Sequence, residues 1–196
     1  MVVFGAGASF DSVSSTPLPA GNDLQEFGVD REVTSRLPLA NQLFKPIPIF
    51  SRSLDRFPQA SPLFPVLEKS AASIGIEARL EEYQAESKTH RHRIVQLASL
   101  RFYLREIIEH AQDRWLKYQR SRLNHITLID EIECGRRGED VLFVTFNYDT
   151  LIETALEVMG MKIETMSDYV AAHPYKIIKL HGSTDWGRVV DFPIKQ

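Results

Sequence analysis

The sequence predicts an α/β fold in which a parallel sheet has helices on both faces. Val141–Phe146 is a continuous run of apolar, β-branched and aromatic residues, as expected for a strand buried on both faces. Two further strand candidates, Met1–Phe4 and Tyr175–Leu180, also lead directly into turns of small and polar residues. Between the first and second strands the pattern becomes helical, which predicts a helical insertion at about residues 63–133.

The clearest helical pattern covers residues 93–122. Apolar residues recur there at steps of three and four, the spacing of one buried helix face. These residues are Ile94, Leu97, Leu104, Ile108, Ala111 and Trp115. Shorter helices are predicted within residues 63–86, with an interruption near Gly75, and over residues 124–133. A short strand is predicted at residues 161–164.

Residues 12–64 are rich in proline, serine and glycine, and proline breaks helices and central strands. This segment is therefore predicted to form loops with short helical pieces. Because long loops in compact domains often act as lids, we expect it to fold over the glycine turn that follows the first strand, with Asn41 as its polar contact. A solvated connector is the alternative.

The composition limits the classes of protein that fit. Of the 196 residues, 43% are hydrophobic and 25% charged, which is a globular composition with room for one domain and an insertion. A net charge of −3 gives a weak electrostatic case for binding nucleic acid. The single Cys134 excludes an internal disulfide and a four-cysteine zinc site. No apolar run approaches the roughly 18 residues that span a membrane, and Met1–Phe4 lacks the features of a signal peptide, so we expect a soluble, cytoplasmic protein with no membrane or nucleic-acid partner.

The first strand ends in a glycine turn, residues 5–9, with the sequence Gly-Ala-Gly-Ala-Ser. Gly5, Ala6 and Gly7 have small side chains or none, so a phosphate group can come close to the backbone N–H groups. Ser9 offers a hydroxyl donor to such a ligand or, alternatively, caps the next helix. The pattern differs from the G-x-G-x-x-G of dinucleotide-binding folds, so the turn alone indicates a phosphate site only weakly.

The second strand ends at Asn147-Tyr-Asp149, and a helix follows. An amide and a carboxylate at the end of a buried strand can bind a sugar hydroxyl or hold a water molecule. Alternatively, Asn147 and Asp149 only cap the helix. Thr150 and Glu153 have the spacing of a capping box, and Gly160 is a stop signal for the helix.

The third strand ends at His181, which Gly182 and Ser183 follow. A histidine at this position suits proton transfer, because histidine side chains commonly serve as general acids and bases. A structural role is the alternative. If the strands are parallel, their carboxyl ends meet at one edge of the sheet, so the three turns are expected to form a single site.

The three turns together resemble the motifs of the sirtuin-like superfamily, which has a G-A-G-x-S turn, a T-Q-N-x-D motif and an H-G motif in this order. In this chain they stand as Gly5-Ala-Gly-Ala-Ser9, Thr145-Phe-Asn-Tyr-Asp149 and His181-Gly182. The phrases F-N-Y-D-T and K-L-H-G-S-x-D-W look similar to the bacterial sirtuin-like NAD hydrolases, including those of anti-phage defence systems. The resemblance extends in order over nearly the whole chain.

This resemblance implies a Rossmann-like domain that binds NAD and breaks the bond between nicotinamide and C1′ of the ribose, giving nicotinamide and ADP-ribose. By the same resemblance the glycine turn approaches the diphosphate, and Gly182 and Ser183 also contact NAD. Asn147 and Asp149 would face the nicotinamide-side ribose or the attacking water, and His181 would act as a base or orient a ribose hydroxyl. Asn147 and His181 are thus the expected catalytic residues, and no metal is expected.

Two other functions stay open, namely a non-catalytic module that binds NAD or ADP-ribose, and an NAD-dependent protein deacylase. Phe146 replaces the glutamine of T-Q-N-x-D, and no four-cysteine zinc ribbon follows His181. Both departures from the sirtuin pattern disfavour the deacylase.

The resemblance also predicts the strand order and the partners. Sirtuin sheets continue after the H-G motif, with a Gly-Thr-Ser turn that holds a ribose, and no such turn follows Trp186. In a strand order of 3-2-1-4-5-6 the strands of this chain would be the first three, so the sheet is expected to be incomplete at its C-terminal side. The chain would then be a fragment or need a partner, either a second copy of itself or an additional effector or sensor domain.

Overall fold

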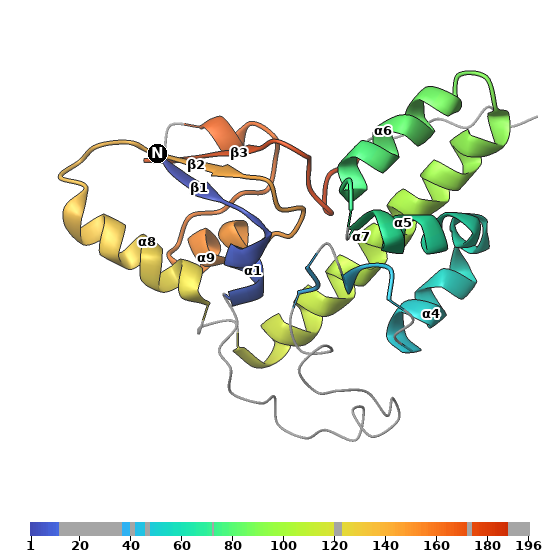
Figure 1. The fold of residues 1–196 in the computed structure, drawn as a ribbon. Helices are drawn as coiled ribbons and strands as arrows, with labels where there is room; N and C mark the ends of the chain where they lie inside the picture. Colours follow the sequence, from blue (N-terminus) through green and yellow to red (C-terminus); the bar gives the residue numbers. More distant parts are fainter. Residues whose placement is uncertain are drawn as a thin grey trace, which may run out of the picture.

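The structure is a computed structural model of the 196-residue chain (Figure 1). It describes residues 1–11, 37–39, 42–45, 48–71, 73–119, 123–171 and 174–187. The predicted contact of Asn41, and the first part of the predicted loop, residues 12–36, lie outside these ranges.

Three parallel strands form one open sheet in the order β1-β2-β3. They are β1 (Val2–Phe4), β2 (Val141–Thr145) and β3 (Tyr175–Lys179). These bounds confirm the three predicted strands, and the order is the one expected for them. The register places Phe4 beside Thr145 and Thr145 beside Lys179. The carboxyl ends of all three strands therefore meet at one edge, and the fold is α/β with a small parallel sheet.

Helices α1 (Ala6–Asp11), α8 (Asn124–Gly135) and α9 (Leu151–Val158) lie on one face of this sheet (Figure 1). Alternate strand residues point toward them, and the rings of Phe143 and Tyr175 stack with their centroids 5.5 Å apart. The buried core on this face consists of Phe4, Ile129, Val141, Phe143, Ile152, Ala155, Leu156, Tyr169, Tyr175 and Ile177. Gly160 follows α9 with a φ of 88°, which confirms it as the stop signal.

The opposite face of the sheet is open. Val3, Val144 and Ile178 are neighbours across the three strands, and the side chains of Val3 and Ile178 are 54% and 42% exposed. Among the described residues, helices cover one face only, so the prediction of helices on both faces is wrong for this part of the chain. The apolar run of β2 was misleading because a strand with aliphatic residues on an open face has the same sequence pattern as a fully buried one.

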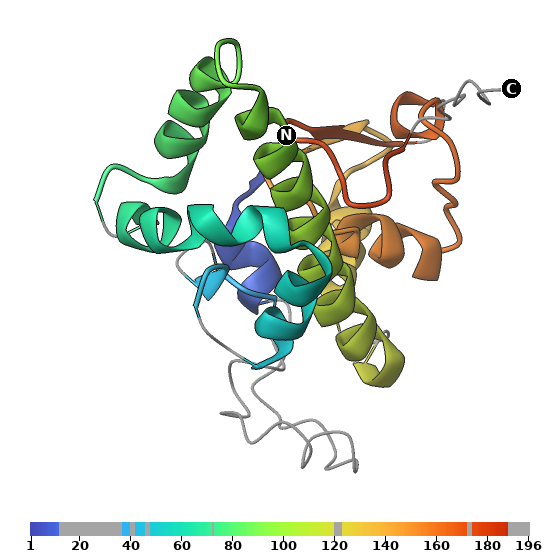
Figure 2. The ribbon, with the colours of Figure 1, turned by 90° about the vertical axis from the view of Figure 1, so that its right-hand side faces the viewer.

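The remaining helices pack around α7 (Arg91–Gln119), the long helix that the sequence predicted (Figure 2). They are α4 (Pro48–Arg56), η2 (Pro58–Leu63), α5 (Phe64–Ala71) and α6 (Ile76–Glu86). Gly75 separates α5 from α6 with a φ of 91°, a left-handed conformation that glycine adopts without steric cost. None of the described helices, α7 included, combines the length and the apolar character needed to cross a bilayer.

The predicted insertion, about residues 63–133, contributes to two separate cores. Its part up to Gln119 packs within the helical cluster, α4 to α7 with η2, whereas α8 packs on the sheet through Ile129. Leu151, the first residue of α9, belongs to the core of the helical cluster. Helix α9 therefore connects the two cores.

Residues 161–164 form no strand, contrary to the prediction. The N–H of Met161 donates to the carbonyl of Leu156, and this bond closes the end of α9. The N–H of Glu164 donates to Oδ2 of Asp168, at the start of η4 (Asp168–Val170). The backbone groups of this segment are thus used by a helix end and a turn instead of a sheet.

Two adjacent isoleucines of β3 test the difference between the two faces. Ile177 is 2% exposed and Ile178 is 42% exposed. We expect Ile177→Ala to lower the free energy of unfolding by about 2–5 kcal/mol, because it leaves a cavity in the core. Ile178→Ala should change it by less than about 1 kcal/mol. Urea denaturation of both variants measures this, and equal losses would show that the open face is covered in solution.

Candidate functional site

Five of the predicted site residues line one cavity at the carboxyl edge of the sheet. They are Ala6, Ser9, Asn147, Asp149 and His181. This edge cavity has a volume of about 340 Å³, and its opposite wall includes Leu80 of α6 and Leu104 and Ile108 of α7. The folding of the chain thus brings together residues from all three turns.

Asn147 forms the central hydrogen bonds of this site. Its Nδ2 donates to the carbonyl O of Gly5 at 2.9 Å and to Oγ of Ser9 at 2.6 Å. Its backbone N–H donates to Oγ1 of Thr145 at 3.0 Å. These bonds join the turn after β2 to the turn after β1. Because no described residue donates to Oδ1 of Asn147, this oxygen is left as an acceptor for a ligand or a water molecule.

Asp149 bonds to the start of α9 and also lines the edge cavity. Its Oδ1 accepts the N–H of Leu151, the first residue of α9, at 3.1 Å, a bond between residues i and i+2 of the Asx-turn type. Its Oδ2 accepts the hydroxyl of Ser9 at 2.6 Å. One oxygen of the Asp149 carboxylate thus bonds to the start of α9, and the other bonds to the hydroxyl of Ser9. Ser9, Asn147 and Asp149 form a buried hydrogen-bonded set, which we call the edge triad.

Neither the conformation of the first turn nor the packing of the described residues against it explains its two glycines. Neither Gly5 nor Gly7 has a positive φ. A Cβ atom added at either position would meet no atom of the described residues within 4 Å. Glycine at both positions therefore leaves the backbone of the turn open to a molecule lying against it.

The turn after β3 is fastened to the turn after β2. Gly182 has a φ of 89°, a conformation that requires glycine. The N–H of Thr184 donates to the carbonyl of Tyr148 at 2.9 Å, and Oγ of Ser183 approaches the same oxygen at 3.3 Å. Gly182 and Ser183 line a neighbouring cavity instead of the edge cavity.

His181 borders the edge cavity with an exposed imidazole ring. The ring of Phe146 lies 5.5 Å away in an edge-to-face arrangement, and the ring of Tyr148 lies 6.0 Å away. Within the described chain the imidazole makes no hydrogen bond, so both of its nitrogens are available to a bound molecule.

The predicted capping box of Thr150 and Glu153 is wrong. Thr150 makes no side-chain cap bond to α9. Instead, Gln112 of α7 pairs with Thr150, since its Oε1 accepts the N–H of Thr150 at 2.8 Å and its Nε2 donates to Oγ1 at 2.6 Å. The carboxylate of Glu153 does not bond to the start of α9, because it pairs with the buried Lys179.

Lys179 lies at the end of β3. Its Nζ is fully buried and donates to Oε1 of Glu153 at 2.8 Å, and also to the backbone carbonyl of Asp149. Tyr169 donates to the same Oε1 at 2.9 Å. Burial raises the pKa of Glu153, and Lys179 opposes this shift. The strand alternation would have revealed Lys179, because it shares the inward face with Tyr175 and Ile177.

Removal of Lys179 should be costly. We expect Lys179→Ala to lower the free energy of unfolding by about 3–5 kcal/mol, because Glu153 is left as an uncompensated buried charge. Lys176 is the matched control on the same strand, since its pair with Asp140 is exposed. Lys176→Ala should cost less than about 1 kcal/mol. Urea denaturation measures both variants, and a small loss for Lys179→Ala would contradict a buried ion pair.

A second buried polar residue, His125 of α8, lies behind the site. Its side chain packs on the ring of Phe4 at 5.3 Å, and its Nδ1 is buried without a hydrogen-bond partner. Burial lowers the pKa of His125, and the negative charge of Asp149 partly opposes this shift. The imidazole is therefore neutral in the folded protein at pH 7. The helical pattern of the sequence did not indicate that His125 is buried.

The neutral state of His125 predicts a pH-dependent stability. Below the unfolded pKa of about 6.5 the unfolded chain binds a proton that the folded chain does not. The free energy of unfolding should therefore fall as the pH decreases below 6.5, by up to about 1.4 kcal/mol per pH unit. Urea denaturation between pH 7.5 and 5 measures the slope. His125→Leu should flatten it, and an unchanged slope in this variant would contradict the assignment.

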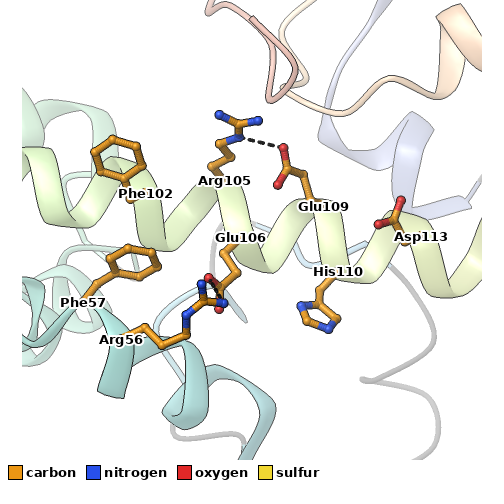
Figure 3. Close-up of a pocket in the computed structure, with 8 residues that line it drawn as sticks. All are labelled: Arg56, Phe57, Phe102, Arg105, Glu106, Glu109, His110 and Asp113. Carbon is orange, nitrogen blue, oxygen red and sulfur yellow. Dashed lines mark hydrogen bonds and ion pairs between the residues drawn. The ribbon is translucent and has the colours of Figure 1, made fainter. Parts of the chain in front are cut away.

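Another cavity, of about 400 Å³, lies on α7 away from the predicted residues (Figure 3). Its glutamates are already paired, because Glu106 binds Arg56 and Glu109 binds Arg105, both at 2.7 Å. Among the described residues, no group of three or more His, Cys, Asp or Glu side chains is arranged to hold a metal ion.

A scan against protein-family models gave no match to this chain, and comparisons with curated proteins and with solved structures gave none either.

Proposed function

We propose that the chain is an NAD glycohydrolase, which cleaves NAD to nicotinamide and ADP-ribose in the edge cavity. The observation that carries this proposal is the edge triad, which lies with His181 around one cavity at the carboxyl edge of a parallel sheet. Ligands of open parallel sheets bind at this edge. The motifs that resemble sirtuins supply the residues of the triad and His181.

The chemistry of the triad suits the ribose of NAD. The nicotinamide ring of NAD carries a positive charge and leaves as a neutral molecule. Its departure therefore needs little acid catalysis. The ribose becomes positively charged in the transition state and must be stabilised. The carboxylate of Asp149 supplies negative charge, and Oδ1 of Asn147 accepts a hydrogen bond from a ribose hydroxyl or from water without adding charge.

His181 is proposed as the base. As the water oxygen bonds to C1′, the imidazole takes the proton of that water, and nicotinamide leaves with the electrons of the broken bond. Its exposed nitrogens border the edge cavity and are not held by another described residue. Gly5 and Gly7 leave room for NAD to lie against the first turn.

A second candidate function is the binding of NAD or ADP-ribose without cleavage. Among the described residues no carboxylate orients His181, and this observation favours a binding role, because catalytic histidines are commonly held by a partner. A protein deacylase is a weaker candidate, since Phe146 replaces the motif glutamine.

The proposed cellular setting is the cytoplasm, where the enzyme would deplete NAD in an anti-phage defence system. The proposed partners are a second copy of the chain or an additional effector or sensor domain.

Nicotinamide release from NAD tests this proposal. The wild-type chain should release it without any acylated peptide, and Asn147→Ala and His181→Ala should each reduce the rate by about 10²–10⁴-fold. His92→Ala is the matched control, because His92 is exposed on α7, and it should keep the full rate. Calorimetry with ADP-ribose separates the candidates, since binding without release indicates the binding module. Release that survives both site variants would reject the assigned roles.

A further inference from the structure

The edge cavity has a neighbour that shares part of its wall. This side cavity has a volume of about 540 Å³ and lies between α6, α7 and the turn after β3. Tyr148 and His181 border both cavities, as do Leu80, Leu104 and Ile108. The two cavities are therefore chambers of one cleft, and the ring of His181 can be reached from either chamber.

The walls of the side cavity suit a flat ring. Leu97, Leu100 and Leu104 of α7 provide apolar surface, and the indole of Trp186 lines the chamber as well. The indole Nε1–H of Trp186 donates to the hydroxyl of Tyr169 at 3.1 Å, so the indole is fixed in one orientation. Apolar walls with a fixed aromatic ring are typical of sites that hold a nucleobase by packing and stacking.

The side cavity also carries an unpaired positive charge. Arg101 lies in its wall, and no carboxylate among the described residues forms an ion pair with it. Its charge is close enough to Tyr148 to lower the pKa of that phenol, against the larger raising effect of burial and that of Glu77. Arg105, one turn further along α7, lines the same cavity but is held by Glu109 at 2.7 Å. Arg101 is thus the cation available to an anionic ligand.

We propose that the side cavity binds a nucleoside phosphate, with the base against Trp186 and the leucines of α7 and the phosphate on Arg101. Two sources of this group fit the chamber. One is the adenosine-phosphate half of NAD itself, which rests on the proposed function. The edge cavity, at about 340 Å³, is small for a whole dinucleotide, since pockets for drug-sized ligands measure about 300–1,000 Å³. The other source is a separate nucleotide that binds beside His181.

Calorimetry with AMP and with adenosine tests this site without requiring any turnover. Wild-type protein should bind AMP, and Arg101→Ala should weaken AMP binding about tenfold or more, the loss expected for one charge-assisted hydrogen bond. Adenosine lacks the phosphate, so its affinity should be the same in both proteins. Arg105→Ala is the matched control and should bind AMP as the wild type does. Circular dichroism confirms that each variant is folded.

The proposal is overturned if wild-type protein does not bind AMP at millimolar concentration, or if Arg101→Ala and Arg105→Ala weaken AMP binding equally. The two sources are separated by adding NAD. If the chamber holds part of NAD, AMP and NAD compete, and Arg101→Ala weakens NAD binding as well. If the ligand is a separate nucleotide, AMP binds in the presence of saturating NAD. A protein that binds AMP through Arg101 but releases no nicotinamide would reject the proposed function and support this site.

Discussion

The parallel register of the three strands is the constraint on which the candidate site depends. Phe4, Thr145 and Lys179 are level with one another, so the residues that follow them emerge at the same edge. Only for this reason can the side chain of Asn147 reach the carbonyl of Gly5, which lies 142 positions away in the sequence. An antiparallel β1 would carry the glycine turn to the other edge of the sheet and leave Asn147 without this partner.

A second set of buried polar groups lies beneath the edge triad, and the two sets meet at Asp149. The carboxylate of Asp149 bonds to Ser9 and its backbone carbonyl bonds to Lys179, which in turn binds Glu153. The desolvation of a buried ion pair offsets much of its attraction, so the pair adds little net stability compared with apolar residues of the same size. Its effect is geometric, because it holds the end of β3, the turn after β2 and helix α9 in one arrangement.

The sequence was informative where the signal is local. The sequence predicted β1, β2, β3, the long α7, the breaks at Gly75 and Gly160 and the juxtaposition of the three turns from periodicity, turn residues and the rule for parallel sheets. The strand predicted at residues 161–164 was the exception. The partners of Thr150 and Glu153 were not predictable, because Gln112 and Lys179 lie 38 and 26 positions away and only tertiary packing brings them close. The open face of the sheet was missed for a different reason. Its aliphatic residues have the same sequence pattern as those of a covered face. Hydrophobicity shows that a side chain is suited to burial, but it does not show that another element covers that side chain.

The helical cluster supplies the second wall of the edge cavity. An edge of three strands presents its turns on an exposed surface. The cavity forms there because α6 and α7 face that edge with Leu80, Leu104 and Ile108, and because Leu37, Pro38, Leu43 and Phe44 add to the wall. The cluster is fixed to the site through Gln112, whose two hydrogen bonds hold the backbone and the side chain of Thr150, next to Asp149. A shift of α7 would therefore displace the wall of both chambers and pull on the residue adjacent to the edge triad at the same time. The width of the cleft and the geometry of the triad are thus coupled through the contact between α7 and the start of α9, which combines the Gln112–Thr150 hydrogen bonds with the packing of Leu151 in the core of the helical cluster.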